Sequence, residues 1–436
     1  MTEYRHIYYA LSVGFLLIAP LCLAETSLHR STSSSKESAS ADALANEHID
    51  TIEVDAGLTL SQLVEITLEK YPDRLINEGL AAEAEALHVR SDSWLAGSTQ
   101  LALTYNDDKI TNNRGYQEGN VEMEFTPWNW GQREAAQNIA DHAQISAEKQ
   151  SVALKLEVAR LVREALWDMA LAENRFQQAK YALDISAQLL EKVRRRVELG
   201  DLARADLLLA DSEHLHNRSL YTQAEAELMH SRKSYANLTR TNHVPDNYRE
   251  QLSPIDIILP DHPLLEAINS IIARKQSTIE WAKNTDTINQ PKINVGATIS
   301  HDPMGSGNSQ TTGIGVVIPF GHSTYDAPEI AAAHLELNRA LSQREHIIRH
   351  LEKTLHEAEH ALEISRSEIA IGNELKQIAE THLKMTETSF SAGEINLLDL
   401  LKIQARSLEA MRNAKEQEVK LQRNIAFYNQ AVGVQP

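Results

Sequence analysis

The residues best suited to chemistry are two histidines with a glutamate between them: His356, Glu357 and His360. On a helix, histidines four residues apart share a face and can hold zinc, while the glutamate can act as a general base, as in zinc peptidases. That chemistry also needs a third ligand and a substrate cleft built by a globular core. The neighbouring apolar residues instead form the stripe of a long helix: Leu351, Leu355, Ala358 and Leu362. We therefore reject a peptidase and expect a protein that catalyses no reaction.

A second histidine pair with the same spacing, His346 and His350, precedes the first pair. Neutral imidazoles in such pairs can bind divalent transition metals. Solvated side chains on a helix surface explain both pairs more simply, so we expect no bound metal and no cofactor.

The only cysteine, Cys22, lies near the end of an uncharged stretch, Ile7–Leu23, which is followed by the small Ala24. This layout predicts a secretory signal that spans residues 1–24 and is cleaved after Ala24. A retained membrane anchor and a lipid-modified Cys22 stay open as alternatives, although the bulky Leu21 fits the second poorly. Cleavage after Ala24 would leave no cysteine, which excludes disulfides and thiolate sites from the mature chain.

Composition excludes one further class of function and predicts long helices. The formal net charge of −19 argues against nucleic-acid binding, which favours a basic face. Residues 25–56 are Ser-rich without a hydrophobic period, and we expect a flexible arm there. Helix-forming residues dominate 132–242 and 328–430 with few Gly or Pro. A helix over Gln132–Glu198 would be roughly 100 Å long, too long for a compact domain.

The sequence is an internal duplication, with residues 57–247 and 248–436 as the two repeats. Each repeat is expected to contain a short helix, two strands and a hairpin of two long helices; in the first repeat the short helix spans about Ser61–Ala96. The predicted strands are about 99–109, 117–127, 291–301 and 311–320, and the predicted hairpins are about 132–242, with its tip near 200, and 328–430, with its tip near 393. The landmarks that align in pairs are Tyr71-Pro72 with His262-Pro263, Pro127 with Pro319, Gly200 with Gly393, and Asp206 with Asp399.

The predicted strands alternate between apolar and polar residues, and each has the length of a tilted transmembrane β-strand. One face would therefore meet lipid and the other a water-filled lumen. Three tryptophans flank the strands where an interfacial girdle would lie: Trp94, Trp128 and Trp130. The polar residues expected to face the lumen are Glu122, Glu124, Asn294 and Thr298.

Four strands cannot close a barrel, and open sheet edges cannot lie in lipid, where backbone polar groups have no partner. Oligomerisation is therefore required. Three copies would supply about 12 strands, within the known range of membrane barrels, and the long helices would continue the tube on the periplasmic side.

With these features the chain resembles the TolC family of outer-membrane efflux proteins over nearly all of the mature sequence. The motifs that carry the resemblance are the paired X-Pro segments, the paired glycine turns and the stretch Pro127–Arg133 at the barrel exit. The resemblance implies a mainly α fold with a transmembrane β portion, and a homotrimer with a 12-strand β-barrel continued by an α-helical periplasmic barrel. It also implies location in the outer membrane, contact with its lipid, and partnership with a periplasmic adaptor and an inner-membrane pump.

Residue by residue, the resemblance assigns adaptor docking to the hairpin tips and a gate to the residues beside them. Asp399 matches a family aspartate that lines the periplasmic aperture, where three copies would form an anionic ring. The residues that match the docking tips are Leu199, Gly200, Asp201, Leu202, Ala392, Gly393, Glu394 and Ile395. A helix-connecting turn and a solvated aspartate are the simpler alternatives at these positions.

The gate departs from the family pattern at three positions. Lys402 lies where the family can place an acidic residue. Phe390 and Ile395 replace a tyrosine and an arginine that can hold the closed state, while Asp206, their expected partner, is present. A latch would need other residues, for example Lys402 with a carboxylate of an adjacent copy.

The resemblance therefore predicts the exit duct of a tripartite efflux or type I secretion-like system, with heavy-metal efflux as one branch. The alternative from another class is a periplasmic coiled-coil scaffold or adaptor without a pore. That alternative predicts no membrane-embedded strands and leaves the alternation at Val121–Phe125 unexplained.

Overall fold

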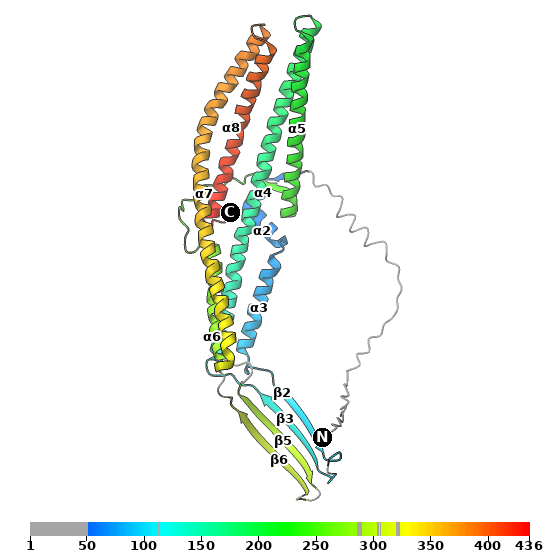
Figure 1. Cartoon of the computed structure of the whole chain (residues 1–436), viewed down its shortest axis with the longest axis vertical. Coiled ribbons are helices and arrows are strands. Elements are labelled where there is room, and N and C mark those ends of the chain that lie inside the picture. The colour runs from blue at the N-terminus through cyan, green and yellow to red at the C-terminus, as the bar shows by residue number, and fades with distance from the viewer. Residues whose placement is uncertain (1–50, 112, 286–289, 303–304, 306, 320–322) are drawn as a thin grey trace, which may run out of the picture. The chain divides into compact units, whose positions relative to one another are not determined.

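The computed structural model describes residues 51–436 except 112, 286–289, 303–304, 306 and 320–322 (Figure 1). The predicted signal peptide, Cys22 and most of the Ser-rich arm lie outside the described residues. The described residues all belong to one unit of the chain. The last residues of the arm form the strand β1 (Glu53–Asp55), which pairs in parallel with β4 (His243–Pro245).

The order of elements confirms the predicted duplicated unit. The first repeat contains α2 (Leu60–Lys70), α3 (Arg74–Asp92), β2 (Gln100–Asp107), β3 (Gln117–Phe125), α4 (Gln132–Glu198) and α5 (Arg204–Thr239). The second repeat contains α6 (Pro263–Asn284), β5 (Lys292–Asp302), β6 (Gly307–Val317), α7 (Ser323–Ser391) and α8 (Leu397–Ala431).

The two X-Pro landmarks have different local roles. We expected one helix over about Ser61–Ala96, but Tyr71 adopts an extended backbone and divides it into α2 and α3, because a residue before proline avoids the helical region. In the second repeat His262 is the N-cap of α6, and its Nδ1 accepts a hydrogen bond from the main-chain N–H of Leu264. The helix α7 also differs from expectation, since it begins at Ser323 and includes Pro328 near its start.

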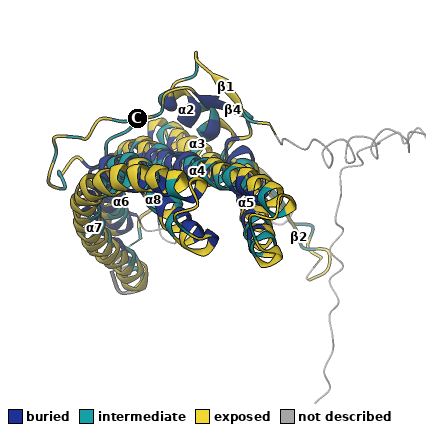
Figure 2. Cartoon of the chain, turned by 90° about the horizontal axis from the view of Figure 1, so that it is seen from above, coloured by how far each residue is buried: buried dark blue, intermediate teal, exposed yellow. Residues whose placement is uncertain are grey.

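The helices form a layer that is four helices wide along its length (Figure 1). Near the hairpin tips the order is α7, α8, α4, α5, and nearer the sheet it is α7, α6, α4, α3, because α4 and α7 run through both levels. The view from above shows these helices as neighbours in a row (Figure 2). The helices α5 and α7 therefore occupy opposite edges at the level of the tips.

A buried arginine joins the two repeats at mid-height. Arg163 of α4 is fully buried, and its guanidinium donates to both carboxylate oxygens of Glu250 at 2.8 and 2.7 Å. It also donates to Oε1 of Gln430 at 2.6 Å and to the carbonyl of Val434 at 3.1 Å. Asn429 donates to the same glutamate at 3.1 Å. One side chain thus ties α4, the segment between the repeats and the C-terminal segment together.

The sheet is antiparallel throughout, with the order β2-β3-β5-β6. The central pair, β3 with β5, joins the two repeats. The strands β2 and β6 are the edges, and within the described residues neither has a second partner strand. Among the described helices, none has the length and hydrophobicity needed to cross a membrane.

Candidate functional site

The sheet places the predicted lumen residues on one face. The register pairs Glu124 with Asn294, and the two-residue period puts Glu122 and Thr298 on the same side. Nζ of Lys292, also on this face, lies 2.8 Å from Oε1 of Glu124. The polar face therefore carries acidic and amide groups, and the charge of Glu124 is balanced by Lys292 of the same chain.

The opposite face of the sheet is apolar and uncovered in the single chain. Eight of its large side chains are at least 43% exposed: Leu101, Leu103, Val121, Met123, Val295, Ile299, Ile314 and Val316. Beside the sheet, Trp94 and Trp130 are 91% and 100% exposed. Contiguous apolar surface of this kind marks contact with a membrane or another protein, and interfacial tryptophans are typical of the first case.

The two hairpin tips have the same construction. Gly200 and Gly393 adopt left-handed φ values of 78° and 79°, which L-residues avoid. In the first tip, the N–H of Gly200 donates to the carbonyl of Val197 and the N–H of Asp201 to that of Arg196, which is a Schellman cap. The second tip repeats both hydrogen bonds from Gly393 and Glu394. The predicted tip residues are exposed except for Leu202 and Ile395, which pack against the apolar cluster below the turns.

The tips contact each other through Arg196 of α4. Its guanidinium donates to the carbonyl of Phe390 at 3.0 Å and lies 4.9 Å from the centre of that aromatic ring. The same guanidinium bonds Oδ2 of Asp201 at 2.5 Å, which orients it. Phe390 is buried among Leu189, Val193 and other apolar residues of both hairpins. The predicted gate residue Phe390 is therefore a contact between hairpins.

The two predicted gate aspartates occupy equivalent positions in the first turns of α5 and α8. The side chain of Asp206 accepts from the N–H of Ala203 at 3.2 Å. The N–H of Asp399 donates to the side chain of Asn396 at 2.8 Å, and Nδ2 of Asn396 donates back to Oδ2 of Asp399 at 2.9 Å. Nζ of Lys402 lies 3.9 Å from Oδ1 of Asp399, so it faces its own chain's aspartate. The side chain of Asp206 contacts the start of its own helix, and among the described residues it makes no hydrogen bond with Phe390.

No protein-family model matches this sequence, and no curated protein sequence is significantly similar to it. Solved structures are similar in fold. VceC, an outer-membrane protein of Vibrio cholerae, matches over 86% of this chain and 96% of its own at 14% identity, with a TM-score of 0.69. The Campylobacter jejuni outer-membrane channel CmeC matches over 86% of this chain and 85% of its own at 15% identity, with a TM-score of 0.68.

A third structure, the open state of the Neisseria gonorrhoeae outer-membrane channel MtrE, matches over 86% of this chain and 89% of its own, at 14% identity and a TM-score of 0.65. The chain has the fold of the TolC-type outer-membrane channels. Coverage of 86% of the chain is large enough to include parts of both repeats.

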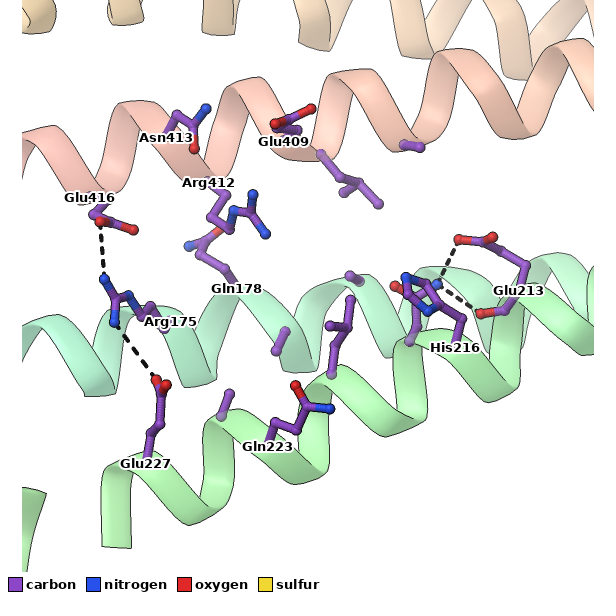
Figure 3. A pocket seen from close by; sticks show the side chains of 17 residues that line it. Arg175, Gln178, Glu213, His216, Gln223, Glu227, Glu409, Arg412, Asn413 and Glu416 are labelled. Carbon is purple, nitrogen blue, oxygen red and sulfur yellow. Dashed lines mark hydrogen bonds and ion pairs between the residues drawn. The ribbon is translucent and has the colours of Figure 1, made fainter. Parts of the chain in front are cut away.

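A groove of about 630 Å³ lies between the hairpins of this TolC-type fold, lined by α4, α5 and α8 (Figure 3). Arg175 of α4 crosses it, with Nη2 at 3.3 Å from Glu416 of α8 and Nη1 at 3.7 Å from Glu227 of α5. Burial alone would raise the pKa of Glu416, but hydrogen bonds from Lys420 and Arg175 outweigh it and hold the pKa below its usual range. The groove is therefore crossed by ion pairs.

The four histidines singled out on α7 lie on the exposed surface of the helix. His346, His350, His356 and His360 are all exposed, and Glu357 faces Lys353 at 3.6 Å. Over the described part of the chain, no three His, Cys, Asp or Glu side chains are grouped so that they could hold a metal ion. Within the described residues, the arrangement lacks the third ligand that a zinc peptidase needs.

Proposed function

We propose that this chain is the outer-membrane exit channel of a tripartite efflux or type I secretion-like system, and that it conducts substrate passively to the exterior. The observation that carries the proposal is the sheet, which is apolar on one face, polar on the other and open at both edges. A homotrimer would contribute twelve strands, which is within the range of closed membrane barrels. Closure would pair every edge and would place the apolar face against lipid.

The helices support the same assembly. Three layers, each four helices wide, would continue the barrel as a tube. The 67 residues of α4 span about 100 Å, which suits a periplasmic conduit. The exposed glycine turns at its far end would receive a periplasmic adaptor and, through it, an inner-membrane pump. Leu199 at the first tip is 78% exposed and would be available for such a contact.

The aperture proposal rests on the place of Asp399 in the first turn of α8, beside the tip. Three copies would bring three such carboxylates together, and a ring of carboxylates favours cations. Lys402, one turn along the same helix, would reduce this preference because it lies near the same carboxylate. The matching Asp206 would contribute in the other hairpin. The lumen of the barrel would be lined by Glu122, Glu124, Asn294 and Thr298.

Single-channel conductance in planar lipid bilayers tests the proposal. We expect the purified protein to form cation-preferring channels, and Asp399→Asn, which keeps a polar group at the cap, to lower that preference. Glu357→Gln, on the middle of α7, is the control that should leave it unchanged. Absence of any channel would contradict the proposed function. Channels whose cation preference is unchanged by Asp399→Asn would contradict only the assignment of Asp399 to the aperture.

A further inference from the structure

Both edge helices of the layer carry an apolar stripe that no other described residue of the chain covers. Each large apolar residue of the two stripes is at least 48% exposed. On α5 the stripe consists of Leu208, Leu215 and Met229, with the exposed Thr222 between the last two. On α7 it consists of Ile364, Ile371, Leu375, Ile378 and Met385.

The spacing of these residues is that of a coiled-coil seam. Leu208, Leu215, Thr222 and Met229 recur every seven residues, as do Ile364, Ile371, Ile378 and Met385. Each helix already has a different seam inside the chain. The seam of α5 with α4 uses Ala210, Asn217 and Ala224, and that of α7 with α8 uses Leu362, Ala379 and Leu383. The exposed stripes are therefore second seams, each facing away from the neighbouring helix of its own chain.

The two stripes are in register with each other when measured from the tips. The bond between Arg196 and Phe390 holds the two turns at the same level. Each stripe has residues eight, fifteen, twenty-two and twenty-nine positions from its own turn glycine, Gly200 or Gly393. Because α5 runs away from its tip and α7 runs toward its tip, the stripes would meet as an antiparallel pair. The pairs so matched are Leu208 with Met385, Leu215 with Ile378, Thr222 with Ile371, and Met229 with Ile364.

Size and charge are complementary in the same register. Between its large residues the α5 stripe carries small exposed ones, and Ser219 lies within one position of the level of the bulky Leu375. Beside the stripes, Arg218 of α5 lies within one position of the level of Glu374 of α7. Both side chains are exposed, and neither bonds any other described residue of its own chain. A second copy would supply the opposite charge to each.

We propose that α5 of one copy packs antiparallel against α7 of a second copy in this register, from Leu208 with Met385 at the tip to Met229 with Ile364. This rests on the proposed function and specifies its interface between copies. The α5 stripe and the α7 stripe lie on opposite edges of one layer, so the contact between copies is head-to-tail. Contacts of this kind build closed rings when the rotation between copies allows it. The occupant of each stripe is thus another copy of the same chain.

Paired cysteines test the register. The variant Leu215→Cys with Ile378→Cys, made in a Cys22→Ser background, should give oxidised dimers and trimers that reductant dissolves, because a disulfide requires Cα atoms within about 7 Å. Leu208→Cys with Met385→Cys is a second matched pair and should behave likewise. The control is Leu208→Cys with Ile378→Cys, which is displaced by one heptad, or about 10 Å along the helix, and should stay monomeric on denaturing gels.

Charge reversal gives an independent test. Arg218→Glu or Glu374→Arg alone should lower the temperature at which the detergent-solubilised assembly dissociates, and the two together should restore it. Trimers in which only the displaced cysteine pair cross-links, or no pair does, would overturn the seam while leaving the channel intact, as would reversed charges without rescue. A parent chain that forms no trimer at all would instead defeat the proposed function.

Discussion

The guanidinium of Arg196 bridges the two helical hairpins by donating to the main-chain carbonyl of Phe390 at 3.0 Å. The bond joins residues 194 positions apart and lies directly beneath both glycine turns. Since Phe390 lacks the hydroxyl of a tyrosine, it contacts Arg196 through its ring and its main-chain carbonyl. A separation of the tips would have to break this contact.

Arg196→Ala should favour separation of the hairpin tips. A hydrogen bond to a charged group contributes about 1.5–3 kcal/mol, so the ratio of closed to open channels should fall by about tenfold or more if that bond is made only in the closed state. Open probability in planar bilayers measures the effect. Arg195→Ala is the control, because the side chain of Arg195 is exposed and bonds no other described residue. Equal open probabilities of the Arg196→Ala and Arg195→Ala channels would refute a specific role for Arg196.

Alanine at either turn glycine should destabilise the tip. Gly200 and Gly393 have open space where a Cβ would lie, so the cost comes only from their positive φ and should be about 1–2 kcal/mol at each site. Asn, which tolerates this conformation better, should cost less. Protease nicking at the tips, followed by gel analysis, reports the loosening. Gly79→Ala in α3 is the control, since its φ is ordinary and its Cβ would meet nothing within 4 Å. It should stabilise α3 by about 0.5–1 kcal/mol.

Loss of the buried Arg163 should be severe. Arg163→Met leaves Glu250 as a charge without its partner in a largely buried site, and the expected loss is about 3–5 kcal/mol of unfolding free energy. Adding Glu250→Leu should recover part of that loss because no lone charge then remains. Chemical unfolding in detergent measures both. Arg160 is half-buried and pairs with Glu157 and Glu164, and replacing it by Ala should change stability by less than about 1 kcal/mol.

His262 should make stability depend on pH. Burial lowers the pKa of its imidazole, and the main chain of Ala431 and then the charge of Asp261 oppose the change without cancelling it. The unfolded chain therefore binds the proton more readily, and this part of the stability is complete above about pH 6.5 and is lost as the pH falls toward the lower folded-state pKa. The difference between the unfolding temperatures at pH 7.5 and pH 5 should be smaller in His262→Asn than in the parent chain. Asn keeps an N-cap acceptor at this position. An unchanged difference would show that other groups cause it.

Local patterns were sufficient to predict the repeats, the alternating strands and the glycine turns. Each of these has a physical cause that acts over a few residues, such as the positive φ at Gly200 and Gly393. The break between α2 and α3 at Tyr71 could also have been predicted, because Tyr71 precedes a proline. The alignment of Tyr71-Pro72 with His262-Pro263 instead suggested that both segments have the same structural role. The two segments differ because only the first follows a helix.

The long-range contacts could not be read from the sequence. Arg163 and Arg196 look like other arginines on a polar helix, yet their partners lie 87 to 271 and 194 residues away, respectively. Only the packing of α4 against the second repeat selects these two for burial or bridging. A latch between Lys402 and a carboxylate of an adjacent copy stays a prediction, whereas the contact between hairpins within the chain is made by Arg196.

Membrane fractionation followed by mass measurement in mild detergent tests the central claim most directly. The account predicts that the mature protein is recovered in the outer membrane and that its protein mass equals three chains. A soluble monomer or dimer in the periplasmic fraction would contradict the channel, and it would favour a coiled-coil scaffold that does not form a pore.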